Sequence, residues 1–288
     1  MDTSKAGIIR MLTIAAAVMI AAFFAGTVSY ADSEDSTFTS YADAQNYVYE
    51  GVMDLDSTIE YTLVVDKIDD RFHKFARASV GTLSSIDDGT TVNGDYAELN
   101  NFNGNSFSYT YTKENGKYTV DVTEKVKYRL SKSQDKAYRA KLNRTLKKMH
   151  LRGSDKTKVR KIYKYITKHV KYDNNYNKTG STAYTAYNAL AKGRAVCNGY
   201  SALFYDMCRR SGVPCRIIVG EANGGLHAWN IVKIGSKWYN ADATWDAGAA
   251  HYRYFLKSDK AFNKTHKRDA EYKSNDFRAS YPMASKSL

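Results

Sequence analysis

The sequence predicts an α+β protein made of a smaller α+β module over residues 32–130 and a larger domain over residues 131–288. Three patterns carry this prediction: a strand pair around residues 107–122, helical spacing of apolar residues over 154–170, and a helix followed by three strands within 196–244. Hydrophobic residues make up 43% of the chain and aromatic residues 13%, which is enough apolar area to bury a core and excludes a disordered chain.

The N-terminus has the layout of a signal peptide. Lys5 and Arg10 precede an apolar run over residues 11–25, and small residues then lead to Ala31. We expect residues 1–31 to be removed after Ala31. The apolar run is shorter than the roughly 20 residues that a spanning helix needs, which argues against the alternative of a membrane anchor. The sequence therefore predicts a secreted, extracellular protein, at most loosely associated with the cell envelope and without a stable membrane anchor.

The chain is strongly basic, with a formal net charge of +13. Outside a cell this charge favours anionic envelope polymers or acidic proteins as neighbours, and we do not expect nucleic acid as a partner. No zinc-ligand spacing, RNA-binding signature or helix-turn-helix pattern occurs, so we interpret the charge as a solvated surface.

The N-terminal module begins with mixed signals. Residues 41–53 are expected to form a helix, residues 58–66 a strand and residues 70–80 a second helix. The clearest element is a hairpin that turns at Asn115-Gly116, with alternating aromatic and polar residues before it and Tyr118, Val120 and Val122 after it. The sequence indicates no function for this module.

The larger domain opens with two helices. Residues 131–150 form a very basic helix, and Gly153-Ser154 then interrupts it. Ser154 is a good N-cap for a core helix, because the apolar residues that follow it lie at helical spacing. These residues are Val159, Ile162, Tyr163, Ile166 and Val170.

A third helix and three strands follow. Residues 196–211 form a helix that ends before Gly212-Val213-Pro214 and turns four residues, Tyr200, Leu203, Phe204 and Met207, toward a core. The strands are expected over residues 216–220, 227–234 and 237–244. The tail from Lys257 onward is charged and ends without a recognisable wall-sorting signal.

The chain has three cysteines, Cys197, Cys208 and Cys215. An odd number in an exported protein leaves one thiol unpaired if the other two form a disulfide. Cys208 and Cys215 could equally well form a disulfide or remain two free thiols. Cys197 lies in the first turn of its helix, where free N–H groups and the helix dipole favour a thiolate. Gly193 and Gly199 flank it and are expected to leave room for a substrate backbone. The alternative is a buried core cysteine.

His227 and Asp242 are brought together by a predicted two-residue turn at Gly235-Ser236. In that register Asp242 faces Trp229, so His227 and Asp242 are diagonal neighbours on one face of the sheet. A three-residue turn would reverse this parity. With the two-residue turn, Asp242 would fix the histidine tautomer and leave the other ring nitrogen to share a proton with Cys197. Asp246 is the second candidate for this carboxylate.

Three sequence blocks resemble the transglutaminase-like superfamily of papain-like thiol enzymes. They are GRAVCNGYS at residues 193–201, HAWN at 227–230 and WYNADATWD at 238–246, in the order of the superfamily's Cys, His and Asp blocks. Upstream, VKYD at 170–173 and TAY at 182–184 are similar to secreted members from Gram-positive bacteria.

The resemblance covers roughly residues 154–256. It implies a papain-like core in which the nucleophile helix packs on an antiparallel sheet, a catalytic triad of Cys197, His227 and Asp242, and no metal or organic cofactor.

The implied activity is amide chemistry on a protein or peptide, with cell-wall peptide as one candidate. Cys197 would form a thioester that water hydrolyses or that an amine accepts. The Cys197 N–H would hold the oxyanion together with a second donor, for which Tyr184 and Tyr187 are candidates. Trp229 and Trp238 are candidates for the acyl site, with core packing as the alternative. The other functional reading is a non-catalytic envelope-binding or adhesive module on the same scaffold.

Overall fold

The computed structural model describes residues 36–78 and 102–288. These residues form two compact units, the first made of residues 36–78 with 102–128 and the second of residues 129–288. Each unit combines helices with a mainly antiparallel sheet, which confirms the α+β class. The predicted signal peptide over residues 1–31 lies outside the described residues.

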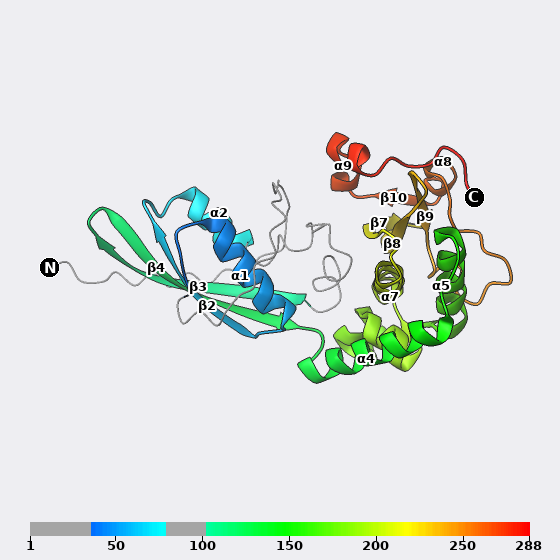
Figure 1. The fold of residues 1–288 in the computed structure, drawn as a ribbon, viewed down its shortest axis with the longest axis horizontal. Coiled ribbons are helices and arrows are strands. Elements are labelled where there is room, and N and C mark those ends of the chain that lie inside the picture. Colours follow the sequence, from blue (N-terminus) through cyan, green and yellow to red (C-terminus); the bar gives the residue numbers. More distant parts are fainter. Residues whose placement is uncertain (1–35, 79–101) are drawn as a thin grey trace. The chain divides into compact units, whose positions relative to one another are not determined.

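The first unit is a four-stranded sheet with two helices on one face (Figure 1). The strands lie in the order β1-β2-β4-β3, with bounds Thr37–Phe38 for β1, Thr58–Val65 for β2, Phe102–Glu114 for β3 and Lys117–Tyr128 for β4. The helices are α1, Tyr41–Met53, and α2, Asp70–Ala78, close to their predicted bounds. The predicted hairpin is confirmed, because Glu114 pairs with Lys117 and both turn residues, Asn115 and Gly116, have positive φ.

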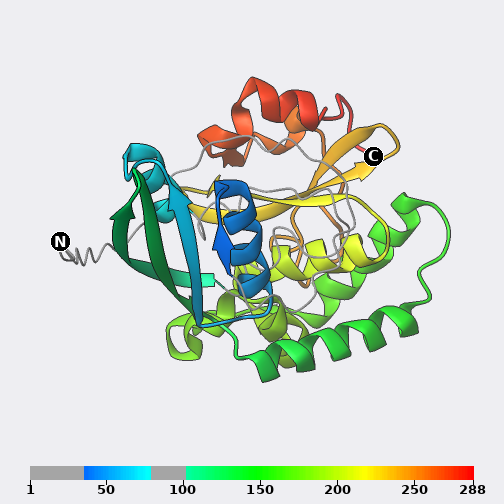
Figure 2. The same ribbon diagram turned by 60° about the vertical axis from the view of Figure 1, so that its left-hand side comes forward.

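The helices of the second unit begin at the predicted caps. Helix α4, Lys132–Met149, starts with a capping box between Ser131 and Gln134, and Ser154 caps α5, Asp155–His169. Helix α7, Cys197–Arg210, packs with α5 around one hydrophobic cluster (Figure 2). None of the helices within residues 36–78 and 102–288 is long and apolar enough to cross a bilayer.

The second unit has a four-stranded antiparallel sheet. Its order is β10-β7-β8-β9, with bounds His266–Arg268 for β10, Cys215–Ala222 for β7, Gly225–Ile234 for β8 and Lys237–Ala241 for β9. The predicted two-residue turn and register are confirmed, because Ile234 pairs with Lys237 and Asn230 with Ala241. Strand β9 ends at Ala241 and not at the expected Thr244, because the Asp242 N–H bonds to the Tyr254 carbonyl outside the sheet.

The charged tail has more structure than its composition indicates. It forms α8, Asp259–Phe262, then edge strand β10, a 3-10 helix over Ala270–Lys273, and α9, Asn275–Ser280. Strand β10 approaches β7 so closely at Gly220 that a Cβ atom there would collide with the Lys267 carbonyl oxygen. This strand covers the sheet edge and brings the tail beside the residues that follow β9.

Candidate active site

Cys197 is the first residue of α7, as the sequence predicts. It follows the short strand β6, Arg194–Ala195, and the Val196 side chain does not cap the helix. The first N–H groups of an α-helix have no partner within the helix and carry a partial positive charge. The buried Cys197 thiol therefore lies where a helix favours an anion.

The space at Gly199, two residues after Cys197, is smaller than expected. A Cβ atom at Gly199 would lie 2.6 Å from Ala195 Cβ and 2.8 Å from the Thr185 carbonyl oxygen. The expectation that Gly199 leaves room for a substrate backbone is thus wrong, because the protein's own chain fills that room. Gly193 is required for another reason, since its φ is +69° and a Cβ atom there would meet the His169 carbonyl at 3.2 Å.

His227 and Asp242 form a direct pair. His227 Nε2 lies 2.8 Å from Asp242 Oδ2, and both side chains are buried. Asp242 Oδ1 accepts hydrogen bonds from the backbone N–H groups of Thr244 at 2.8 Å and Trp245 at 3.2 Å. The carboxylate is therefore held from both ends, with one oxygen aimed at the imidazole.

The charges of the site reinforce each other. Burial lowers the pKa of His227, but hydrogen bonds with Asp242 and Cys197 and the charges of both groups outweigh it and raise the pKa to about 9. Burial raises the pKa of Asp242, but its hydrogen bonds with His227 and His266 and their charges lower it to about 2. The pair is thus an ionised carboxylate beside a protonated imidazole at neutral pH.

Asp246, the second candidate carboxylate, has other partners. Its Oδ2 accepts from the Tyr163 hydroxyl at 2.6 Å, and its two oxygens accept from the backbone N–H groups of Arg253 and Tyr254 at 2.8 and 2.9 Å. These bonds hold the turn after β9 and do not reach His227.

His266, which the sequence analysis did not single out, also contacts Asp242. Its Nε2 lies 3.2 Å from the same Oδ2 that His227 contacts. The three residues lie close enough to hold a metal ion, and their short N···O distances equally fit hydrogen bonds to an ionised carboxylate. No periodic pattern marks His266, because it lies in a three-residue strand within a charged tail.

Trp229 and Trp238, the two tryptophans predicted as candidates for the acyl site, lie in the interior. Trp229 is buried beside His227, and its Nε1 donates to Asn240 Oδ1 at 3.3 Å. Trp238 is buried against the Tyr281 ring. Both belong to the hydrophobic cluster on the face of the sheet that carries His227, which is the packing role that strand aromatics commonly have.

In contrast to the two buried tryptophans, Tyr172 and Leu226 are exposed apolar side chains next to the site. Tyr172 pairs in parallel with Ala195, two residues before Cys197, and its side chain is 43% exposed. Burial raises the pKa of Tyr172, and the charge of Cys197 adds to this rise. Leu226, directly before His227, is 84% exposed. Tyr184 is half-buried against Tyr176.

Cys208 and Cys215 are free and fully buried. Burial and a hydrogen bond with Cys215 raise the pKa of the Cys208 thiol. Cys197, by contrast, contributes to the raised pKa of His227, and its Sγ lies 3.6 Å from Asn198 Oδ1.

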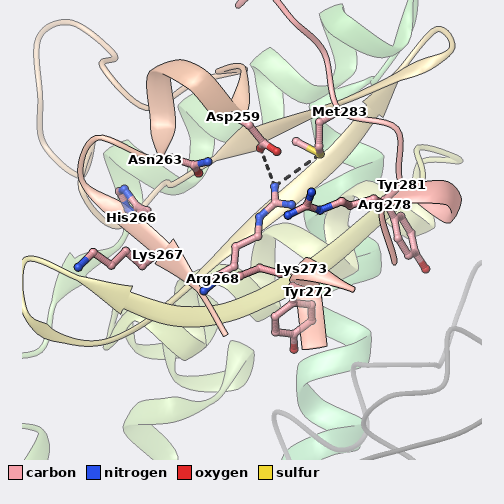
Figure 3. Close-up of a pocket in the computed structure, with 10 residues that line it drawn as sticks. All are labelled: Asp259, Asn263, His266, Lys267, Arg268, Tyr272, Lys273, Arg278, Tyr281 and Met283. Carbon is pink, nitrogen blue, oxygen red and sulfur yellow. Dashed lines mark hydrogen bonds and ion pairs between the residues drawn. The ribbon is translucent and has the colours of Figure 1, made fainter. Parts of the chain in front are cut away.

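A separate cavity of about 560 Å³ lies along β10 and the tail (Figure 3). His266 lines it, and the Arg268 guanidinium inside it bonds to Asp259 Oδ1 at 2.8 Å and approaches Met283 Sδ at 3.5 Å. Its wall includes neither Cys197 nor His227.

Comparisons with known proteins find similarity within the second unit. Residues 141–243 match the family model of the transglutaminase-like superfamily. Over 108 residues the chain is 32% identical to the kyphoscoliosis peptidases of Mus musculus and Homo sapiens, a match that covers 33% of this chain and 16% of each relative. A solved structure of a TGase aligns with 78% of this chain and 63% of its own, at 16% identity and a TM-score of 0.37. The family match contains Cys197, His227 and Asp242 and ends before His266.

Proposed function

Because residues 141–243 are a transglutaminase-like domain, we propose that this chain is a secreted thiol enzyme that acts on amide bonds through a thioester on Cys197. The observation that carries the proposal is the buried 2.8 Å pair of His227 and Asp242, with the Cys197 thiol close enough to help raise the pKa of His227. A nucleophile, a base and a group that orients the base are the elements that thiol acyl transfer requires.

The first half of the reaction breaks the amide. Since Asp242 binds Nε2, the His227 nitrogen that serves Cys197 is Nδ1. The Cys197 sulfur attacks the carbonyl carbon, the C–N bond breaks, and Nδ1 passes its proton to the leaving amine. The product is a thioester and a neutral His227.

The second half releases the acyl group. His227 Nδ1 takes a proton from water or from an amine, and the resulting nucleophile displaces the Cys197 sulfur. Water gives hydrolysis of a peptide or isopeptide bond, and an amine gives protein-glutamine acyl transfer. We propose hydrolysis, because water is always present and no described group forms an amine site.

Two features of the site are suited to binding a substrate: free N–H groups at the start of α7 and exposed apolar side chains beside Cys197 and His227. The N–H groups at the start of α7 can stabilise the oxyanion, because the Val196 side chain does not cap them. Tyr172 and Leu226 are exposed beside Cys197 and His227, and we assign them to the surface that contacts the substrate. We propose Tyr184, which is half-buried against Tyr176, as a further candidate for substrate contact.

The experiment that tests the function is the capture of the acyl-enzyme. The protein is mixed with a peptide library, quenched in acid, and the mass added to Cys197 is read by peptide mapping, with Cys197→Ala as the control. A second reaction with a glutamine peptide and a labelled amine distinguishes the products. Cleavage without amine incorporation supports hydrolysis, incorporation supports transfer, and the absence of any adduct on Cys197 contradicts both.

Secretion is part of the proposal and rests on residues 1–31. The test is the N-terminal sequence of the protein recovered from culture medium. We expect it to begin at Asp32, and recovery of the full chain from the cell fraction alone would contradict secretion.

A further inference from the structure

We propose that His266 is a positioning residue that keeps the Asp242 carboxylate aimed at His227. This inference rests on the proposed function, because it concerns the same site. His266 lies outside the family match, on an edge strand that the catalytic residues do not share.

The Asp242 carboxylate has four donors around it. Its Oδ2 is shared by two imidazoles, with Nε2 of His227 at 2.8 Å and Nε2 of His266 at 3.2 Å. Its Oδ1 accepts the N–H groups of Thr244 and Trp245. A buried carboxylate stays ionised only when such donors replace its lost water. Without His266, the oxygen that serves His227 would lose one of its two donors.

His266 presents an N–H group to Asp242. Its Nε2 faces an ionised carboxylate, which can only accept, so Nε2 carries a ring proton, while Nδ1 lies 2.8 Å from the Thr265 hydroxyl. The ring is stacked 3.9 Å from Phe262 and lies 4.6 Å from Trp245, measured between ring centroids. Both the tautomer and the orientation of the ring are thus controlled by its neighbours.

Small residues on β7 let the rings of the two histidines approach each other. His227 on β8 pairs with Gly220, and His266 on β10 pairs with Ala222, so a whole strand separates them. Their ring centroids nevertheless lie 5.5 Å apart. Large side chains at positions 220 and 222 would stand between the rings, because both positions share the face that carries the histidines.

The cavity beside His266 offers a way to test the hydrogen bond separately from packing (Figure 3). In His266→Ala the lost ring leaves a hole that adjoins the cavity, so a small molecule can enter. Imidazole has both the shape of the ring and an N–H donor. Thiazole has nearly the same shape but no N–H donor, and it stays neutral at pH 6, where an imidazole is largely protonated.

The experiment measures the rate at which iodoacetamide alkylates Cys197 at pH 6 and the ¹H NMR signal of the His227 Nε2–H proton. We expect His266→Phe and His266→Ala to slow alkylation about tenfold or more, in line with other buried partners that orient a reactive group, and to shift the NMR signal. His266→Gln, which keeps an amide donor, should retain most of the rate. Imidazole should restore His266→Ala, and thiazole should not.

Ile218→Ala is the matched control, because Ile218 is buried in the cluster of Trp229 and Phe262, the rings that pack against His266, and its aliphatic side chain cannot donate to Asp242. The proposal is overturned if His266→Phe keeps the native rate and NMR signal, if Ile218→Ala produces the same change, or if both small molecules rescue equally. Slow alkylation of the unmodified protein would instead contradict the proposed function, so the two failures are distinguishable.

Discussion

The Tyr163 hydroxyl on α5 lies 2.6 Å from Asp246 Oδ2 and 2.6 Å from the backbone carbonyl oxygen of Asp242. Tyr163 is fully buried, and it connects a core helix to the turn that carries the orienting carboxylate. The geometry of Asp242 therefore depends on a residue whose sequence pattern indicates only a core position.

Tyr163→Phe tests this connection. The substitution leaves two buried acceptors without their hydroxyl donor, so we expect the free energy of unfolding to fall by about 1–2 kcal/mol. Urea denaturation measures the loss. Tyr200→Phe removes another buried hydroxyl, which donates to the Val170 carbonyl at 2.7 Å, and serves as the comparison. Cys197 alkylation should slow only in Tyr163→Phe, and equal rates in the two variants would contradict a link to Asp242.

The reactivity of Cys197 gives a second prediction. Iodoacetamide at pH 6 should label Cys197 faster than it labels free cysteine, whereas Cys208 and Cys215 should not react in the folded protein because both are fully buried. Asp242→Asn removes the charge that helps to raise the pKa of His227, so the imidazolium beside Cys197 becomes less populated. We expect labelling to slow about tenfold or more, because an amide at position 242 no longer holds the histidine tautomer or stabilises the imidazolium.

Mass spectrometry of the labelled protein checks this prediction. One adduct that disappears in Cys197→Ala is the expected result. Two or three adducts on the native protein, or an unchanged rate in Asp242→Asn, would count against it.

Some residues of this site can be predicted from the sequence, and others cannot. The positions of Cys197, His227 and Asp242 could be predicted, because a helix start and a two-residue hairpin are local features with a fixed geometry. His266 could not, because its place depends on the pairing of β10 with β7, a contact between residues about 45 positions apart. The three residues of β10 are His, Lys and Arg, and they lack the alternation that predicts a strand.

The glycine beside the nucleophile shows a related difficulty. Gly193 and Gly199 indicate little side-chain bulk beside Cys197, but they do not indicate what occupies the space. The Thr185 carbonyl oxygen and Ala195 fill it, because the chain around residue 185 folds back against the start of α7. Long-range contacts of this kind have no signature in the local sequence.

The pH dependence of stability provides a third prediction. The pKa of His227 is raised from 6.5 to about 9 in the folded protein, so its stabilising contribution is present below pH 6.5 and is lost as the pH rises toward 9. The contribution is at most about 3 kcal/mol by the same linkage. Urea unfolding at pH 6 and pH 9.5 measures it. The decline should be smaller in His227→Gln, and an equal decline in both proteins would show that other groups cause it.

The exposed surface beside the site gives a fourth prediction. Leu226→Ala should lower kcat/KM for a cleaved peptide severalfold through lost apolar contact, because Leu226 is 84% exposed next to His227. The alkylation of Cys197 by iodoacetamide should not change, since this reagent is too small to need the surface. Tyr47→Ala, an exposed aromatic in the first unit, is the control. A loss of alkylation in Leu226→Ala would indicate damage to the site and not to substrate contact.

The fifth prediction concerns Gly220, which lies opposite His227 on one side and Arg268 on the other. In Gly220→Ala the new Cβ atom meets the Lys267 carbonyl oxygen, and rigid backbone on both sides leaves little room for relaxation. We expect β10 to move away from β7, with a loss of about 1–3 kcal/mol in the free energy of unfolding. Gly225→Ala is the matched control, because its Cβ atom would meet nothing closer than 4.0 Å.

The displacement of β10 should also move His266 away from Asp242. Gly220→Ala should therefore slow the alkylation of Cys197 as His266→Phe does, and combining the two substitutions should slow it little further, because both remove the same hydrogen bond. Hydrogen exchange at the β7–β10 pairing measures the movement directly. Full protection of these amides in Gly220→Ala, with native alkylation, would show that the strand tolerates a side chain at this position.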